Sequence, residues 1–195
     1  MDRNMAQRSL FLELPRELRD KIHEFTVLAH RSGIKQSLPP SRSALFTSNA
    51  AILLASKQMR DEYTTILQEI VPSPDYPQAT IEVPITDVNF TTLIAFTSAL
   101  TPAEREMIYA KLHIRLSFSE QTKPMDLAIN LAKWADACET RGVPARYEVG
   151  GSICERAWLG MRSAMFVAEQ HMGAPGVEIG RIYRALLACR GVDGM

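Results

Sequence analysis

The first hydrophobic pattern along the chain is an apolar strip, residues 10–15, that runs into a short amphipathic helix. Proline suits the first turn of a helix because its missing N–H would have no partner there, so Pro15 predicts the helix start. Leu18, Ile22 and Phe25 follow at the spacing of one helix face. Such a stripe is normally a core face, whereas the strip before it is equally suited to binding a partner and to stapling the helix start.

A second helix is expected after a long loop. Segment 29–48 has no periodicity and contains Gly33, Pro39 and Pro40, which predicts a loop, and Asn49 is suited to cap the helix that follows. The apolar face of this second helix consists of Ile52, Met59, Tyr63, Ile66 and Ile70. The stripe of the first helix is expected to pack on the first three of these residues.

A group of prolines after the second helix marks the best candidate for a domain boundary. These prolines end the helix and form a stiff link: Pro72, Pro74 and Pro77. We therefore expect a helical module at residues 8–71 and a second module at residues 78–191.

The second module alternates strands and helices. Period-two alternation of apolar and polar residues predicts strands at 80–86, 112–118 and, more weakly, 145–149. Helices are expected at about 88–100, 124–140 and 177–189, and capping-box spacing at 101–104 and 152–155 starts two further helices. Strands that alternate with helices favour parallel crossover connections. The expected fold class is α+β, with an N-terminal helical module followed by a βαβαβα unit whose sheet is small and mainly parallel.

Composition narrows the classes of partner. The 195 residues carry 22 basic and 22 acidic side chains, so no overall attraction to nucleic acid or to an anionic membrane is expected. The cysteines Cys138, Cys154 and Cys189 are widely spaced and odd in number, which favours reduced thiols. No apolar run reaches the length of a signal peptide core or a membrane span. We therefore expect a cytoplasmic or nuclear protein with no nucleic-acid and no membrane partner.

No residue pattern in the sequence indicates a particular reaction, and no catalytic, cofactor-binding or metal-binding residue is predicted. Residues 150–152, Gly-Gly-Ser, lack the full nucleotide-binding patterns and are interpreted as a tight turn with a helix cap. Cys154 stands at the same helix start without a recognisable base or oxyanion donor, so it is expected to be a small buried side chain. The histidines fall on separate elements without metal-ligand spacing: His23, His30, His113 and His171.

Two segments of the first module carry a family resemblance. Residues 14–22 read Leu-Pro-Arg-Glu-Leu-Arg-Asp-Lys-Ile, and residues 52–62 read Ile-Leu-Leu-Ala-Ser-Lys-Gln-Met-Arg-Asp-Glu. Together they resemble the F-box-like domains that are abundant in filamentous fungi, with Ser56 where that family often has a cysteine. The resemblance covers about residues 10–70, roughly a third of the chain.

The resemblance implies a non-enzymatic adaptor. Its helical module would bind the linker subunit of a cullin-type ubiquitin ligase, and its C-terminal module would hold an unknown target protein. Leu14 and Pro15, supported by Leu18 and Ile22, would present the partner-binding surface. The alternative is a small α/β ligand-binding domain or enzyme of unknown reaction, using loops 119–123 and 150–153 at the carboxyl ends of the strands. A third option is a structural or self-associating protein with an incomplete F-box relic.

Overall fold

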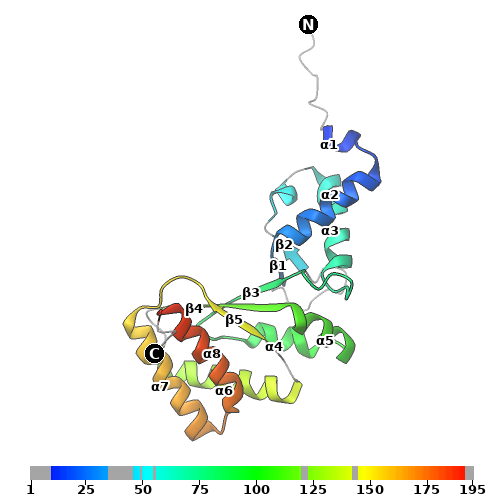
Figure 1. Ribbon diagram of the computed structural model, residues 1–195. Helices are drawn as coiled ribbons and strands as arrows, with labels where there is room; N and C mark the ends of the chain where they lie inside the picture. The colour runs from blue at the N-terminus through cyan, green and yellow to red at the C-terminus, as the bar shows by residue number, and fades with distance from the viewer. Residues whose placement is uncertain are drawn as a thin grey trace. The chain divides into compact units, whose positions relative to one another are not determined.

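The computed structural model describes residues 10–34, 46–48, 50–54, 56–119, 123–141 and 145–191 (Figure 1). The chain divides into two compact units, Met1–Ile81 and Glu82–Met195. The division falls inside strand β3 (Ile81–Thr86), slightly beyond the proline segment. The module ranges expected from the sequence, 8–71 and 78–191, stay a prediction. No helix in the described ranges has both the length and the apolar character needed to cross a membrane.

The first unit consists of short helices and a small β-hairpin. Its elements are α1 (Leu10–Glu13), α2 (Arg16–Ala29), β1 (Ser32–Ile34), β2 (Phe46–Ser48), the 3₁₀ helix η1 (Ala51–Leu54) and α3 (Lys57–Ile70). Helices α2 and α3 pack against each other. Strands β1 and β2 pair antiparallel, and the Ser32 N–H donates to the Thr80 carbonyl at 3.0 Å, which sets β1 beside the start of β3.

The hairpin corrects the expectation of a loop throughout segment 29–48, because β1 and β2 stand at its two ends. A side chain far along the chain completes the backbone pairing of β2. The Gln68 side-chain amide on α3 accepts from the Phe46 N–H at 3.2 Å and donates to the Phe46 carbonyl at 3.0 Å. A strand of three residues is too short to show the alternation of apolar and polar residues by which a strand is recognised in a sequence.

The start of the second helix also differs from the expectation. The helix expected to run from Asn49 is divided, with η1 first and α3 beginning only at Lys57. Ser56 is the N-cap of α3, and its hydroxyl accepts from the Met59 N–H at 3.3 Å. Asn49, the predicted cap, lies outside the described residues.

The second unit confirms the α+β class with a small, mainly parallel sheet. After β3 come α4 (Thr91–Ser98), α5 (Pro102–Lys111), β4 (Leu112–Ser117), α6 (Pro124–Arg141), β5 (Arg146–Val149), α7 (Glu155–Met172) and α8 (Gly176–Cys189). In this unit the strand order is β3-β4-β5. β5 runs parallel to β4, with His113 opposite Arg146. The ends of β3 and β4 lie together, because the Asp87 N–H donates to the Ser117 carbonyl at 2.9 Å.

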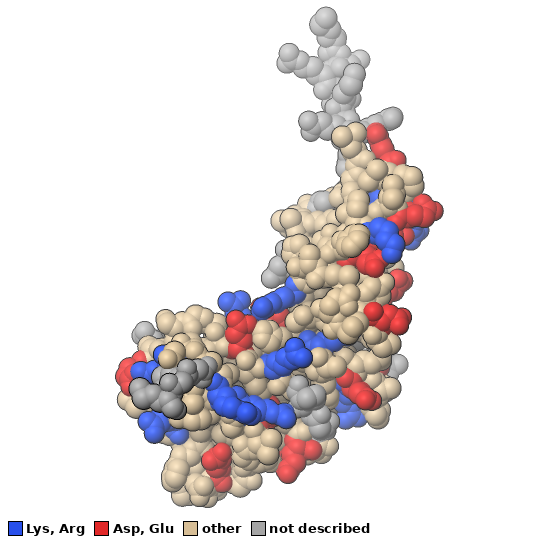
Figure 2. Space-filling model, in the orientation of Figure 1, with Lys and Arg blue, Asp and Glu red and all other residues tan. Residues whose placement is uncertain are grey.

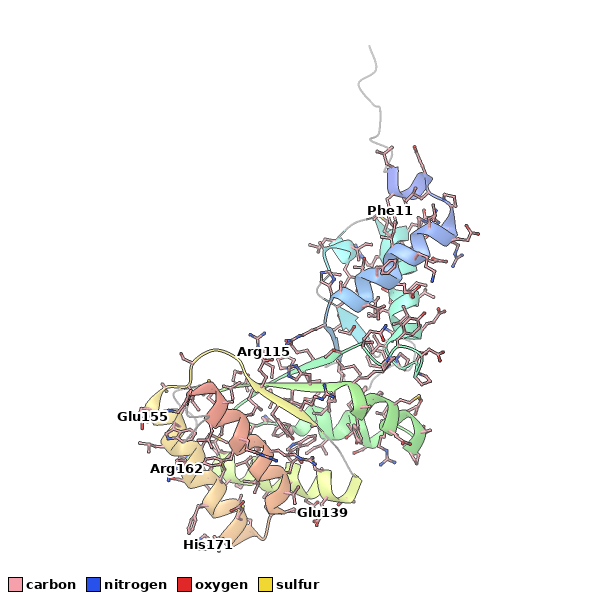
Figure 3. All side chains as sticks on the ribbon, in the orientation of Figure 1. Phe11, Arg115, Glu139, Glu155, Arg162 and His171 are labelled. Atoms are coloured by element: carbon pink, nitrogen blue, oxygen red, sulfur yellow. The ribbon has the colours of Figure 1, made fainter. Side chains whose placement is uncertain are left out.

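The alternation seen in the sequence separates the two faces of this sheet. One face is buried under the helices and consists of Ile81, Val83, Ile85, Leu112, Ile114 and Leu116. The other face carries charged pairs: Arg115 lies 3.6 Å from Glu82, and the His113 imidazole lies 3.5 Å from the Glu148 carboxylate. Figure 3 shows Arg115 on the side of the sheet away from α6, α7 and α8.

Helix ends in this unit follow the sequence signals in part. The capping box of Thr101 and Glu104 is present in full at the start of α5. Gly173 ends α7 in the left-handed conformation, with φ 65°, where the absence of a Cβ removes the steric penalty. The predicted capping box at 152–155 is wrong, because Cys154 occupies the N-cap of α7 and makes no side-chain cap hydrogen bond.

A buried polar network ties β5 to the helices beneath it. The Trp134 indole N–H on α6 donates to the Tyr147 hydroxyl on β5 at 2.6 Å, and that hydroxyl donates to the buried Glu178 carboxylate on α8. Arg181 donates to the other oxygen of Glu178 at 2.9 Å. Burial, together with the nearby Cys138 and Glu178, holds the pKa of Tyr147 well above its usual value. The hydroxyl therefore stays protonated and remains a donor.

The network predicts that Tyr147→Phe destabilises the second unit. The substitution leaves the Trp134 N–H without its acceptor and removes a donor from the buried Glu178 carboxylate, which costs about 1–3 kcal/mol. Urea unfolding followed by circular dichroism measures the change. Tyr183→Phe is the matched control, because its ring stacks on Trp158 outside the network, and it should shift stability by less than about 0.5 kcal/mol. Equal effects of the two substitutions would contradict this account of the network.

Candidate partner-binding surface on the first helices

The apolar stripe of α2 faces outward. Leu18 is 52% exposed, Ile22 40% and Phe25 68%. The expectation that this stripe is a core face packed on the second helix is therefore wrong. We call these three residues the outer stripe.

Two polar residues, Arg19 and His23, share the inward face of α2 with the apolar Val27. Arg19, His23 and Val27 recur at a spacing of four residues, and both His23 and Val27 are buried. Arg19 forms a two-pronged contact with Glu62 of α3, with its Nε 3.0 Å from Oε2 and its Nη2 2.8 Å from Oε1. A planar guanidinium matches a carboxylate in this arrangement, which makes the contact both strong and directional. The orientation of α2 is consequently set by a charged pair rather than by its apolar stripe.

The apolar strip before α2 is attached to the same arginine. The Nη1 of Arg19 donates to the Leu14 carbonyl at 2.6 Å and to the Leu12 carbonyl at 3.4 Å. Phe11 of α1, labelled in Figure 3, has its ring centroid 5.3 Å from that of His23. Leu10 is 79% exposed. Arg19 thus holds in place a strip in which Leu10 and Pro15 are exposed beside the charged Glu13.

The four predicted partner-binding residues lie in one short stretch of the first unit. Pro15, Leu18 and Ile22 are exposed, and Leu14 is half-buried. Pro15 is the N-cap of α2 rather than its first residue, with φ −51° and ψ 146°. Phe25 is a further exposed member of the stripe, although its spacing predicts a core residue.

Charges beside the outer stripe are mutually neutralised. Arg16 lies 3.6 Å from Asp20, and the Lys21 ammonium lies 2.7 Å from the Glu24 carboxylate. In Figure 2 the surface over α1 and α2 is mostly uncharged, with acidic and basic side chains grouped along one side. An apolar centre with charged residues at its rim is the usual anatomy of a protein–protein interface.

In the described part of the second unit, the candidate site residues are not arranged around one another. Cys154 is exposed, so the expectation that it is buried is wrong. Neither histidine of this unit is engaged with Cys154: His113 pairs with Glu148, and the His171 ring lies edge-on to Phe166 at 6.0 Å. Over the described ranges, no group of histidine, cysteine and acidic residues is placed to hold a metal ion.

A strained turn follows β3 and has no counterpart in the sequence signals. Asp87 and Val88 both adopt the left-handed conformation, with φ 53° and 50°. A β-branched residue is unusual there, and such strain often accompanies functional sites. The Asp87 carboxylate, however, accepts from the Ser119 N–H and the Ser119 hydroxyl, each at 2.8 Å. Its oxygens are therefore engaged in joining the ends of β3 and β4.

Comparisons with known protein-family models, with curated proteins and with solved structures find no match. The resemblance of residues 14–22 and 52–62 to F-box-like domains accordingly stays a prediction from the motifs. The geometry of the outer stripe and of the strip before it is the independent observation that bears on function.

The Arg19–Glu62 pair predicts an acid-sensitive first unit. Hydrogen bonding from Arg19 lowers the pKa of Glu62 from 4.5 to about 2. A carboxyl group whose pKa is lower when folded stabilises the fold above the unfolded pKa, and that stability is lost as the pH falls from about 4.5 toward 2. Glu62→Gln should remove this part of the acid dependence, as measured by thermal unfolding between pH 7 and 3. Glu69→Gln, an exposed carboxylate on the same helix, should retain it. An unchanged acid dependence in Glu62→Gln would refute the assignment.

Proposed function

We propose that this protein is a non-enzymatic interaction adaptor of the F-box-like type, whose first helices bind the linker subunit of a cullin-type ubiquitin ligase. One observation carries the proposal: the apolar stripe of α2 is directed outward while Arg19 and His23 occupy the inward face. A short amphipathic helix with apolar residues on its free side fits the binding mode in which a helix lies in an apolar groove.

The outward orientation of the stripe is a specified feature of the unit. If α2 were only weakly attached, it would turn its apolar side inward, because burying a leucine or phenylalanine side chain contributes about 1.5–3 kcal/mol. The contact between Arg19 and Glu62 and the burial of His23 and Val27 hold the opposite orientation. The fold itself therefore keeps Leu18 and Ile22 at the surface, which supports a role in partner binding.

The strip before α2 extends this surface. Pro15 is exposed at the N-cap, and Leu18 lies one turn further along the same helix. Leu14 is half-buried, and its carbonyl is held by Arg19, so its position relative to the outer stripe is defined. We assign to these residues the role that the resemblance implies, an apolar anchor at the edge of the linker-binding surface.

The rest of the proposal concerns the role of the second unit and the cellular compartment of the protein. The second unit would hold the target protein, as the resemblance implies. The three cysteines are free thiols, which supports a reducing compartment, and we include a cytoplasmic or nuclear location in the proposal.

The alternative function is a small ligand-binding domain or enzyme in the second unit. The strained pair Asp87 and Val88 at the carboxyl end of β3 is the observation that favours it. Against it, the Asp87 carboxylate is engaged by Ser119, and Cys154 stands apart from the interactions of His113 and His171. The adaptor function is the better supported of the two.

The proposal predicts that two charges in the outer stripe abolish partner binding without unfolding the protein. Leu18→Asp with Ile22→Asp places carboxylates at exposed positions, so the circular dichroism spectrum should stay native. Binding to a purified linker subunit should weaken by at least about 30-fold, which corresponds to the loss of a single interface hot spot. Isothermal titration calorimetry measures this change.

Two further variants make this experiment decisive. Leu14→Asp with Pro15→Ala tests the strip before α2 and should also abolish co-purification. Phe166→Asp is the matched control, because Phe166 is a 61% exposed aromatic residue of the second unit and should leave binding unchanged. Full binding by the stripe variant would refute the adaptor proposal. A different result would point to self-association of the outer stripe: the wild-type chain forms a dimer, the stripe variant is monomeric, and the wild-type chain does not bind the linker subunit.

A further inference from the structure

His23 is a buried titratable residue that the proposed partner surface does not use. Its side chain is 0% exposed, on the inward face of α2. Neither ring nitrogen has a hydrogen-bond partner among the described residues. A buried polar group without a partner is costly, and a charge at the same place costs more.

The nearest acid to His23 is Glu62 of α3. The Nε2 of His23 lies 3.6 Å from Oε2 of Glu62, which is beyond hydrogen-bond distance. Both Glu62 oxygens already accept from Arg19, and Oε1 also accepts from Gln58 at 3.0 Å. A protonated His23 would therefore be a second cation beside a carboxylate that already pairs with Arg19.

The other titratable groups around His23 are also engaged. On α2, Asp20 pairs with Arg16. On α3, Tyr63 places its ring 5.8 Å from the imidazole and directs its hydroxyl to Ser48 at 2.9 Å. From α1 the group that faces the imidazole is the apolar ring of Phe11, while the charged residue of α1, Glu13, is exposed.

Helix α1 is a short element that contacts His23 through the Phe11 ring. It has four residues and none of them is buried. In addition to this ring contact, Arg19 donates hydrogen bonds to the carbonyls of Leu12 and Leu14. Lifting α1 would admit water to the imidazole without separating α2 from α3. Such a small local opening requires far less free energy than global unfolding.

We propose that His23 is a proton-operated latch, in which protonation of its ring releases α1 and the chain as far as Leu14 while α2 and α3 stay paired. The latch is a property of the first unit alone. Its consequence for partner binding rests on the proposed function, because Leu14 and Pro15 belong to the partner-binding residues.

The direction of the pH effect follows from the surroundings of the ring. Burial lowers the pKa of His23 below 6.5, with Arg19 adding to this and with Glu62 and Asp20 opposing it. A histidine whose pKa is lower in the closed form binds protons better when open, so acid favours opening. Each pH unit below 6.5 shifts the open-to-closed ratio by about tenfold, until the pKa of the closed form is reached.

Nuclear magnetic resonance on the full chain tests the latch. The nuclear Overhauser effect between the Phe11 and His23 rings reports closure of α1 over the imidazole. The Leu14 N–H donates to the Phe11 carbonyl at 3.2 Å, and its protection against hydrogen exchange reports whether this turn stays formed, since so short a helix is not stable once released. Between pH 7.5 and 5.5 we expect this protection factor to fall by up to about tenfold. The nuclear Overhauser effect between the Phe11 and His23 rings should weaken with it. Amides inside α2 and α3 should keep their protection.

Variants separate the latch from general acid sensitivity. In His23→Gln, the protection of Leu14 should become independent of pH over this range. His30→Gln removes an exposed histidine at the end of the same helix and should keep the wild-type response. If His23→Gln fails to fold, the wild-type chain decides alone: the nuclear Overhauser effect between the Phe11 and His23 rings must weaken over the same pH range in which the His23 ring titrates.

Three outcomes would overturn the latch. A His23 pKa at or above 6.5 would show that the proton is accommodated by Glu62 inside the closed form. An unchanged nuclear Overhauser effect between the Phe11 and His23 rings across the range would show that α1 does not open. Equal loss of protection in α2 and α3 would show that the first unit opens as a whole. None of these outcomes depends on a partner, so the latch and the adaptor proposal fail independently.

Discussion

The two-pronged contact between Arg19 and Glu62 is the interaction on which the first unit depends. Arg19 turns the inward face of α2 toward α3 and, through its remaining nitrogen, holds the Leu12 and Leu14 carbonyls. It therefore determines at once which side of α2 is buried and where the chain before it runs. The exposure of Leu18 and Ile22 is a consequence of this contact. A small unit has little core, so a single directional pair can decide the orientation of a helix.

Much of the second unit could be predicted because its signals are local. Alternation over six residues indicates a strand and its buried side, as in Leu112–Ser117. The capping box of Thr101 and Glu104 lies within four residues, and Gly173 ends its helix where the sequence indicates. The exposed side chain of Cys154 escaped prediction, because burial at a helix start depends on what packs above it.

The first unit could be predicted only in outline. Helix α2 and its stripe are evident from spacing, but periodicity identifies a face without saying which way that face points. The deciding partner, Glu62, lies 43 residues from Arg19 along the chain. Spacing is therefore compatible with both a core role and a partner role for Leu18 and Ile22, and their exposure in the folded unit excludes the core role. The short β2 strand depends in the same way on Gln68, which lies 22 residues from Phe46.

The strained turn after β3 has a consequence for how the second unit forms during synthesis. Two successive left-handed residues, one of them β-branched, are unstable in an isolated strand end. Asp87 is held there by Ser119, which emerges from the ribosome 32 residues later. Strand β3 therefore cannot adopt its final ending until β4 has been made and paired. Nascent chains that stop before β4 should therefore lack the contacts that hold this turn.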